Sequence, residues 1–143
     1  LMSSVSTYLN FQGQTEEAFT LYSRAFAQPL GSIMRFRDMP ADARPPLSDA
    51  ELDMVMHAEM DIVAGHRIMA TDMVASMGQT VRVGNNTTIN LNLDTREEAD
   101  RIYAVLSEGG AEGSGMRDEF WGYWGSCLDQ FGIRWMFNVP PAN

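Results

Sequence analysis

The sequence of 143 residues is poor in cysteine and in basic side chains. Its single cysteine, Cys127, excludes an internal disulfide and is typical of a reducing compartment. Ten basic residues stand against nineteen acidic ones, which gives a net charge of -9. We therefore expect no nucleic-acid partner and no membrane partner, because phosphate-rich surfaces are bound by clustered lysine and arginine.

The beginning of the sequence has no basic segment followed by an apolar run, and no stretch needs a membrane to explain it. On these grounds we expect a cytoplasmic protein. The length fits one compact domain, or two half-size repeats that share a core. Eleven methionines are many for this length, and they serve either as flexible core filling or as the wall of an adaptable ligand cavity.

A strand followed by a capped helix occurs twice in the chain. In residues 87–110, alternating polar and apolar residues predict a strand, and Thr95 with Glu98 predicts the start of a helix. Residues 7–26 show the same order, and the corresponding strand motifs are Leu9-Asn10-Phe11 and Leu91-Asn92-Leu93. This duplication predicts two modules of one architecture.

Period-two patterns predict three further strands after each helix, and hence an α+β fold. The single domain then has a first module at residues 5–72, a connection at 73–86 and a second module at 87–139. Residues 39–53 are rich in proline and polar side chains. We expect them to form an exposed excursion without an element of its own, either a lid or a plain surface loop.

Residues 53–72 predict a β-hairpin with a tight turn at Ala64-Gly65. A two-residue loop sets His57 opposite Asp72, with Glu59 on the same side as His57. A carboxylate beside an imidazole holds one tautomer and raises its basicity, as a general base requires. His57, Glu59 and Asp72 are therefore candidate catalytic residues, and the alternative is a polar pair that serves only packing.

Polar side chains on the first strand of each module indicate a wet cavity, because a buried amide or hydroxyl is costly unless water or a ligand satisfies it. The candidate ligand-binding residues of this kind are Tyr8, Asn10, Asn90 and Asn92. Trp121 and Trp135 are candidates for flat apolar walls. The alternative for each tryptophan is a place in the core or in a subunit interface.

Motifs spread over almost the whole chain carry a family resemblance. They are Tyr8-Leu9-Asn10-Phe11, Glu16-Glu17-Ala18, Tyr22, His57-Ala58-Glu59, Met69-Ala70-Thr71-Asp72, Phe120-Trp121-Gly122, Asp129-Gln130-Phe131-Gly132 and Trp135-Met136. Together they resemble the vicinal oxygen chelate superfamily of glyoxalases, bleomycin-resistance proteins and extradiol dioxygenases, and within it the PhnB-like branch. Members of this branch have carried the label 3-demethylubiquinone 3-methyltransferase-like. The resemblance implies two βαβββ modules whose curved mixed sheets surround a cavity.

In the metal-using members of this superfamily, four inward side chains bind a divalent ion, one from the first and one from the last strand of each module. Strand parity places these positions at Ser6, Ala70, Thr88 and Met136. Alanine and methionine offer no ligand for a hard cation, and neutral serine and threonine are poor ones. We therefore expect no metal site and no cofactor.

The resemblance and the missing ligands favour a metal-independent protein that binds a small molecule, of a sequestering or resistance type. One alternative is an enzyme, a lyase, isomerase or dioxygenase that depends on a divalent metal or on His57. Another is a dimerisation module without a ligand. We expect a homodimer in each case, because members of this superfamily usually cover their open sheet edges with a second chain.

Overall fold

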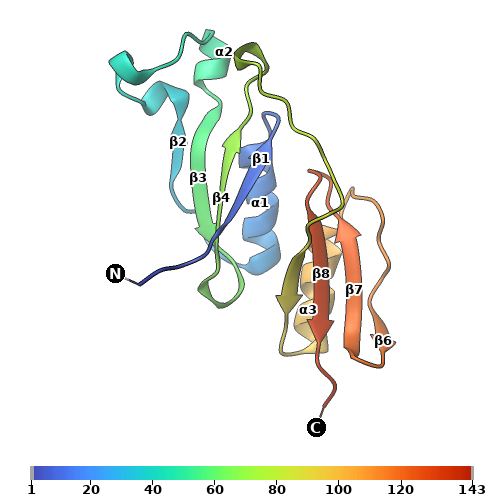
Figure 1. Cartoon of the computed structure of the whole chain (residues 1–143). Helices are drawn as coiled ribbons and strands as arrows, with labels where there is room; N and C mark the ends of the chain where they lie inside the picture. The colour runs from blue at the N-terminus through green and yellow to red at the C-terminus, as the bar shows by residue number, and fades with distance from the viewer. Residues whose placement is uncertain (1, 143) are drawn as a thin grey trace. The chain divides into compact units, whose positions relative to one another are not determined.

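The computed structural model describes residues 2–142. It has an α+β fold with two four-stranded mixed sheets, each backed by a helix (Figure 1). The strand order is β1-β4-β3-β2 in one sheet and β5-β8-β7-β6 in the other. The same topology therefore occurs twice, as the duplication in the sequence predicts, and each sheet is open.

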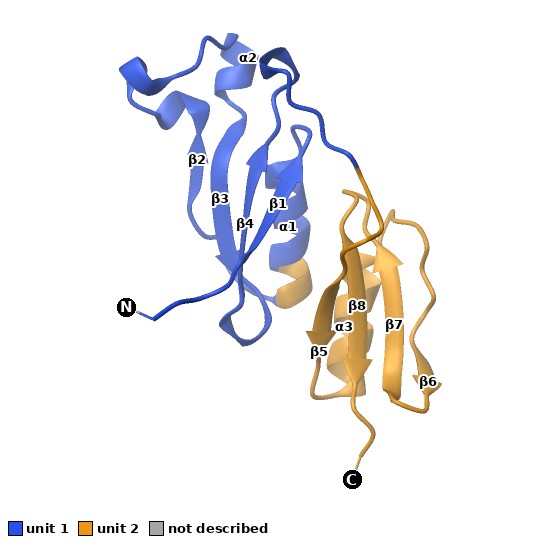
Figure 2. Cartoon of the chain, in the orientation of Figure 1, with its two compact units in different colours: residues 1–23, 27–82 blue, residues 24–26, 83–143 orange. Residues whose placement is uncertain are grey.

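The chain divides into two compact units (Figure 2). Unit 1 contains the described residues up to Ser23 and Ala27–Arg82. Unit 2 contains Arg24–Phe26 and the described residues from Val83 onward. Each unit thus holds one complete sheet.

Unit 1 is built on a strand, a helix and three further strands. These elements are β1 (Thr7–Phe11), α1 (Thr15–Phe26, whose last turn counts with unit 2), β2 (Ile33–Arg35), β3 (Val55–Asp61) and β4 (Arg67–Asp72). β1 runs parallel to β4, and the other two pairings are antiparallel. Phe19 and Tyr22 of α1 and Phe11 of β1 are buried. The core of unit 1 therefore lies between α1 and one face of the sheet.

The connection from β2 to β3 contains three short elements that the sequence did not predict. They are the 3-10 turns η1 (Phe36–Asp38) and η2 (Ala41–Ala43) and the helix α2 (Asp49–Leu52). Ser48 and Glu51 form a capping box at the start of α2. Arg37 donates to the carbonyl oxygen of Asp49 at 3.1 Å, and Arg44 donates to that of Arg37 at 2.8 Å. We expected no secondary structure in this segment, and that prediction was wrong. Arginine side chains donate hydrogen bonds to backbone carbonyl groups that have no backbone partner in this proline-rich segment.

The β3–β4 connection differs from the predicted two-residue turn. Three residues, Val63–Gly65, form the 3-10 turn η3, and the N–H of Ile62 donates to the carbonyl oxygen of His66 at 2.8 Å. Ala64 lies in the left-handed region at φ 56° and is followed by Gly65 at φ 72°. The loop is therefore one residue longer than the pattern predicted.

The longer loop moves the pairing of the two strands by one residue. Glu59 lies opposite Met69, where the predicted register placed Ala70. Side chains alternate between the two faces of a strand, so a shift by one residue changes which face each partner shares. Asp72 therefore points to the face that α1 covers, whereas His57 points to the other face.

The pairing of β2 with β3 contains a register shift. Met34 lies opposite His57, and the next residue, Arg35, lies opposite Val55, so that Met56 is an extra residue. Met34 is 42% exposed because it shares the uncovered face with His57.

Unit 2 repeats the plan of unit 1. Its elements are β5 (Ile89–Asn92), α3 (Arg96–Leu106), β6 (Arg117–Glu119), β7 (Gly122–Leu128) and β8 (Arg134–Val139). β5 runs parallel to β8. The Thr95 hydroxyl oxygen accepts a hydrogen bond from the N–H of Glu98 at 3.1 Å, which confirms the predicted start of α3. Leu91, Ile102 and Phe137 form part of the core between α3 and the sheet.

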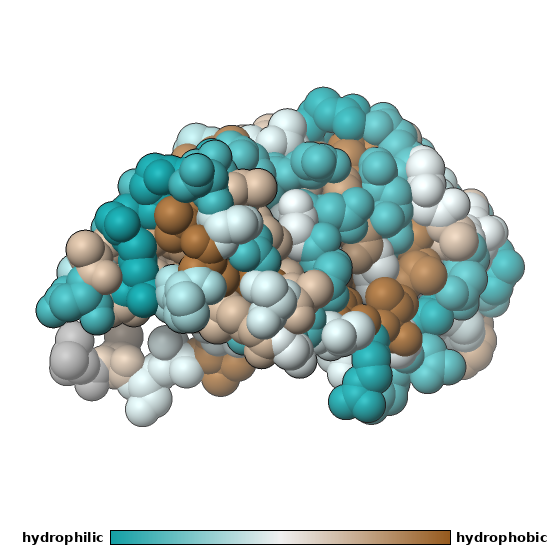
Figure 3. Space-filling view, turned by 90° about the horizontal axis from the view of Figure 1, so that it is seen from above, coloured by the Kyte–Doolittle hydropathy of each residue, from teal (hydrophilic) through white to brown (hydrophobic). Residues whose placement is uncertain are grey.

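The face shown in Figure 3 is mostly polar, with apolar side chains in small groups. The largest exposed fractions among big apolar side chains are those of Met2, Phe120 and Val5. Within residues 2–142, no helix has the length and apolar character that a membrane crossing requires.

Candidate functional site

The strongest candidate site lies on the face of the unit 1 sheet that α1 does not cover, which we call the open face. Its side chains come from alternating positions of four strands. They are Tyr8, Asn10, Met34, His57, Glu59, Asp61, Arg67, Met69 and Thr71. All are exposed or half-buried, whereas the intervening Leu9, Ala58 and Ala70 are buried against α1. The open face is thus polar with a methionine component.

Three open-face side chains form a continuous hydrogen-bonded line. The hydroxyl oxygen of Tyr8 lies 3.2 Å from Nδ1 of His57. Nε2 of the same ring lies 3.2 Å from Oε2 of Glu59. The strand register causes this arrangement, because Glu59 follows His57 by two positions on β3, and β4 alone separates β3 from β1.

The Glu59 end of the line adjoins a hollow. Arg67 donates to Oε1 of Glu59 at 3.4 Å and to Oδ1 of Asp61 at 3.1 Å. These three side chains line a hollow of about 250 Å³ together with residues 28–32, which precede β2. Gly31 allows the segment before β2 to lie close to the backbone of β3, because a Cβ atom at residue 31 would stand 2.2 Å from the carbonyl oxygen of Glu59.

The line has a defined direction of hydrogen bonding. A carboxylate only accepts, so Nε2 of His57 carries the proton that faces Glu59. In the neutral ring Nδ1 is then the acceptor, and the Tyr8 hydroxyl donates to it. The order is hydroxyl, imidazole, carboxylate, which is the order that activates a hydroxyl group in many enzymes.

Partial burial changes the acidity of Tyr8. Desolvation raises the pKa of the Tyr8 phenol, and a hydrogen bond with the Thr71 side chain offsets part of this rise. Tyr8 is therefore a neutral hydrogen-bond donor at neutral pH. The side chain is still 46% exposed, so it remains open to another molecule.

Asp72 does not belong to this site, and the predicted His57–Asp72 pair was wrong. Asp72 is 3% exposed, and its carboxylate accepts hydrogen bonds from the backbone N–H of Thr15 at 3.0 Å and of Val55 at 2.8 Å. It thereby ties the end of β4 to the starts of α1 and β3. The three-residue loop of the hairpin is the physical reason, because it moves Asp72 to the covered face.

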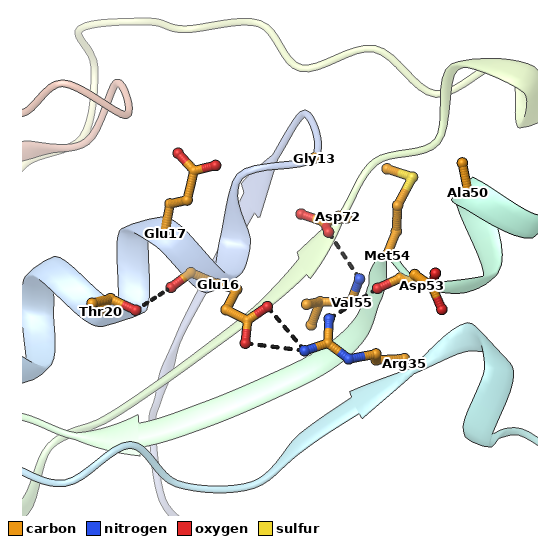
Figure 4. Close-up of a pocket in the computed structure, with 10 residues that line it drawn as sticks. All are labelled: Gly13, Glu16, Glu17, Thr20, Arg35, Ala50, Asp53, Met54, Val55 and Asp72. Carbon is orange, nitrogen blue, oxygen red and sulfur yellow. Dashed lines mark hydrogen bonds and ion pairs between the residues drawn. The ribbon is translucent and has the colours of Figure 1, made fainter.

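Asp72 lines a second pocket of about 400 Å³ at the start of α1 (Figure 4). Arg35 spans this pocket and donates to both carboxylate oxygens of Glu16 at 2.9 and 3.0 Å, and to the carbonyl oxygen of Asp53 at 2.9 Å. The Arg35 guanidinium therefore already satisfies the acceptors that face it. We therefore interpret this pocket as structural: its contacts connect α1 with residues 36–53, and we do not assign it a ligand.

The asparagines predicted to bind a ligand lie on the uncovered faces of their own sheets. Asn10 is exposed on the open face of unit 1. Asn90 and Asn92 are exposed on β5 of unit 2, where Nδ2 of Asn90 lies 3.3 Å from Oδ1 of Asn92. Because solvent reaches them, they do not carry the desolvation cost that we expected of buried amides, and their role in binding stays a prediction.

The two predicted tryptophan walls have different positions. Trp135 is fully buried, and its indole N–H donates to Oδ2 of Asp129 at 2.8 Å, so it takes the core position that was the alternative to a ligand-facing wall. Trp121 is 43% exposed at the β6–β7 turn, where its ring lies 6.0 Å from that of Trp124. Trp124 was the better candidate, because it occupies the uncovered face of β7 beneath the Arg117 guanidinium at 5.3 Å. Its period-two position on the strand was the available signal.

The side chains at the superfamily's metal positions do not suit a hard divalent ion. Ala70 faces α1, so the open-face position on β4 is Met69, which pairs with Tyr8. In unit 2, Asn90 pairs with Met136. The other two expected positions, Ser6 and Thr88, directly precede β1 and β5. Neither their neutral hydroxyls nor the thioethers of Met69 and Met136 form the oxygen-rich anionic ligand set that such ions prefer. Within residues 2–142, no group of three or more His, Cys, Asp or Glu side chains is placed to hold a metal.

The sequence matches the family model described as 3-demethylubiquinone-9 3-methyltransferase over residues 3–137. Protein YjdN of Escherichia coli (strain K12) is 30% identical in an alignment of 142 residues that covers 94% of each chain. The crystal structure of PA1353 from Pseudomonas aeruginosa is 29% identical, with a TM-score of 0.83 over 97% of this chain and 98% of that one.

A glyoxylase/bleomycin resistance protein/dioxygenase domain from Frankia sp. EAN1pec shares the fold. Its TM-score is 0.66 at 12% identity, over 99% of both chains. At this identity the likeness concerns the fold alone. Together with the family match, it confirms the resemblance to the vicinal oxygen chelate superfamily and its PhnB-like branch.

Proposed function

The chain belongs to the 3-demethylubiquinone-9 3-methyltransferase family and has the glyoxalase/bleomycin-resistance fold, and from this premise we propose that it is a metal-independent small-molecule binding protein. The ligand binds on the open face of unit 1. One observation carries the proposal, namely the line from Tyr8 through His57 to Glu59 on a sheet face that also bears Met34 and Met69.

This combination suits a ligand with polar and apolar parts. Small-molecule sites typically join apolar walls to a few placed hydrogen-bonding groups. Methionine supplies a polarizable, adaptable apolar contact. Met34 is 42% exposed beside His57, and Met69 is half-buried beside Tyr8. A ligand on this face gains apolar contact and hydrogen bonds from the same few residues.

Metal independence is supported by the chemistry of the donor positions. Met136 is one of the positions that strand parity assigned to the superfamily's metal ligands, and Met69 is the uncovered neighbour of another, Ala70; a thioether is a poor partner for a hard cation. The family's name also refers to a methyl transfer. The first strand-to-helix turn is Gln12-Gly13-Gln14, which lacks the glycine-rich pattern of nucleotide-type cofactor sites, so we propose binding and not methyl transfer.

A thermal-shift titration of the purified protein against a metabolite panel tests the proposal. We expect at least one amphipathic compound to raise the melting temperature, because a ligand that binds only the folded state stabilises it. His57→Ala should remove the response, and His66→Ala, which changes the chain's other histidine, should preserve it. No response to any compound would count against a binding protein.

A second measurement separates metal-free from metal-dependent binding. After treatment with EDTA, the ligand response should be unchanged, and elemental analysis of the untreated protein should find no stoichiometric divalent metal. Retained metal together with a response that EDTA abolishes would refute metal independence and restore the metal-dependent alternative.

We also propose that the protein works as a homodimer. The outer strands of the two sheets are β1 and β2 in unit 1 and β5 and β6 in unit 2, and unpaired strand edges in soluble proteins are usually covered. Exposed Phe120 and Trp121 add apolar surface of the kind found in interfaces. Sedimentation equilibrium is expected to give twice the chain mass, and the mass of one chain would contradict this.

A further inference from the structure

The open face holds three side chains in an order that goes beyond binding. Tyr8, His57 and Glu59 form a hydroxyl–imidazole–carboxylate line with 3.2 Å at each step. In such a line the carboxylate orients the ring, the imidazole takes a proton, and the hydroxyl meets the other molecule. The Tyr8 end is the accessible one, since Tyr8 is 46% exposed and the side chains of His57 and Glu59 are 30% exposed.

We infer that Tyr8, His57 and Glu59 form a proton relay that removes a proton from the bound ligand. The inference rests on the proposed binding function and adds an activity to it. The ligand's X–H bond breaks and its proton joins the Tyr8 oxygen, while the original hydroxyl proton of Tyr8 passes to Nδ1 of His57. Return of the proton to another ligand atom gives an isomer, so no oxidant or other reactant is needed.

The charge that develops on His57 has a partner in place. Once Nδ1 is protonated, the ring is an imidazolium whose Nε2–H points at the Glu59 carboxylate. Arg67 holds the other oxygen of that carboxylate at 3.4 Å and also bonds Asp61. Glu59 is therefore a positioning residue, which fixes the tautomer of His57 and stabilises its charged form.

The phenol sets the class of ligand. Burial raises the pKa of Tyr8, so the phenol stays protonated at neutral pH and acts as a base only by passing its proton to His57. A phenol-mediated relay suits weakly acidic protons. We assign the ligand to compounds with a C–H group beside a carbonyl, or with a thiol or hydroxyl group, next to an apolar part.

The tautomer of His57 gives a test that needs no ligand. Long-range ¹H–¹⁵N spectra of the neutral ring should show the Nε2–H form in the wild type, and Glu59→Gln should reduce the population of that form. His66, whose Nε2 lies 2.8 Å from the Thr7 hydroxyl, should keep its spectrum in the variant. A neutral wild-type ring protonated at Nδ1 would overturn the relay.

Acetylation by p-nitrophenyl acetate tests the activation of Tyr8 directly. The Tyr8 oxygen attacks the ester carbonyl, p-nitrophenolate leaves, and the hydroxyl proton goes to His57. The sequence has no lysine to compete for the reagent. Tyr123 is the internal control, because its hydroxyl donates to the Asp100 carboxylate at 2.6 Å.

We expect peptide mass spectrometry to show that Tyr8 is acetylated faster than Tyr123. The Tyr8 rate should fall by about 100-fold in His57→Ala, which is the size of a typical general-base contribution, and by a smaller factor in Glu59→Gln. Equal rates at the two tyrosines, or a Tyr8 rate unchanged by His57→Ala, would overturn the relay.

These outcomes separate the relay from the binding proposal. A ligand that stabilises both the wild type and Tyr8→Phe, without activation of Tyr8, leaves binding in place and rejects the relay. Acetylation that depends on His57, without any ligand in the thermal-shift panel, supports the relay and counts against the binding proposal.

Discussion

The indole N–H of Trp135 donates a 2.8 Å hydrogen bond to the Asp129 carboxylate, and both residues are buried. The other oxygen of Asp129 accepts from the backbone N–H of Phe131 at 2.8 Å and of Ile133 at 3.0 Å. One carboxylate thus closes the β7–β8 turn and fixes the largest side chain of the unit 2 core. This hydrogen bond explains why the Trp135 side chain lies in the core of unit 2 and does not line a ligand site.

Asp129→Ala is expected to lower the free energy of unfolding by about 3 kcal/mol, because three N–H donors lose one acceptor group. Urea denaturation followed by tryptophan fluorescence measures the loss. Gln130→Ala, at the exposed neighbouring position, is the control; it removes one exposed hydrogen bond, to the carbonyl oxygen of Glu108 at 3.2 Å, and should change stability by no more than about 1 kcal/mol. Equal effects of the two substitutions would show that the Asp129 bonds contribute little.

Thr15→Val is expected to leave stability unchanged or to raise it by up to about 1 kcal/mol. The Thr15 hydroxyl is buried and has no hydrogen-bond partner within the described residues, so its removal costs no hydrogen bond. Valine keeps the shape of the threonine side chain, and its backbone N–H can still donate the hydrogen bond that Asp72 accepts. Thermal unfolding measures the change, and a clear loss of stability would contradict an unpaired hydroxyl.

Gly31→Ala is expected to destabilise the fold by about 2 kcal/mol and to weaken ligand binding. A Cβ atom there would stand 2.2 Å from the backbone carbonyl oxygen of Glu59, so the loop beside the hollow must move away. Gly84→Ala is the matched control, because its nearest contact would be an ordinary 3.7 Å. Chemical denaturation and the thermal-shift assay report the two effects separately.

Cys127 is expected to resist thiol reagents in the folded protein. Burial, with a smaller contribution from the Asp129 charge, raises the pKa of the thiol from 9.0 to about 12. The neutral thiol is thus favoured in the folded state, so its contribution to stability is present below pH 9 and is lost as the pH rises toward 12. Iodoacetamide labelling at pH 8 should require urea, and rapid labelling without urea would contradict the burial.

The two long helices, α1 and α3, and the succession of strands along the chain could be predicted from the sequence, because local signals determine them. The repeated strand-helix order predicted α1, and the Thr95 cap predicted the start of α3. The alternation along β1 placed Tyr8 on the opposite face from Leu9 and Phe11, which are buried. His57, Glu59 and Tyr8 were therefore found as candidates before the structure showed that they touch.

The partners of these residues could not be predicted, because they depend on register. Ala64 takes a left-handed backbone that glycine usually takes, so the extra loop residue had no distinct signal. The shift moved Asp72 to the start of α1, and Glu59 became the carboxylate beside His57. The β-bulge near Met56 likewise depends on pairing with β2 and not on the local pattern of β3.

In unit 1 the first strand is hydrogen-bonded to the last one, β4, and the pairing is parallel. During synthesis on the ribosome, β1 therefore stays without its neighbour until β4 has left the exit tunnel. A nascent chain stopped before Arg67 cannot complete this sheet, and β5 must wait for β8 in the same way. Each half of the protein is thus expected to fold in a single late step.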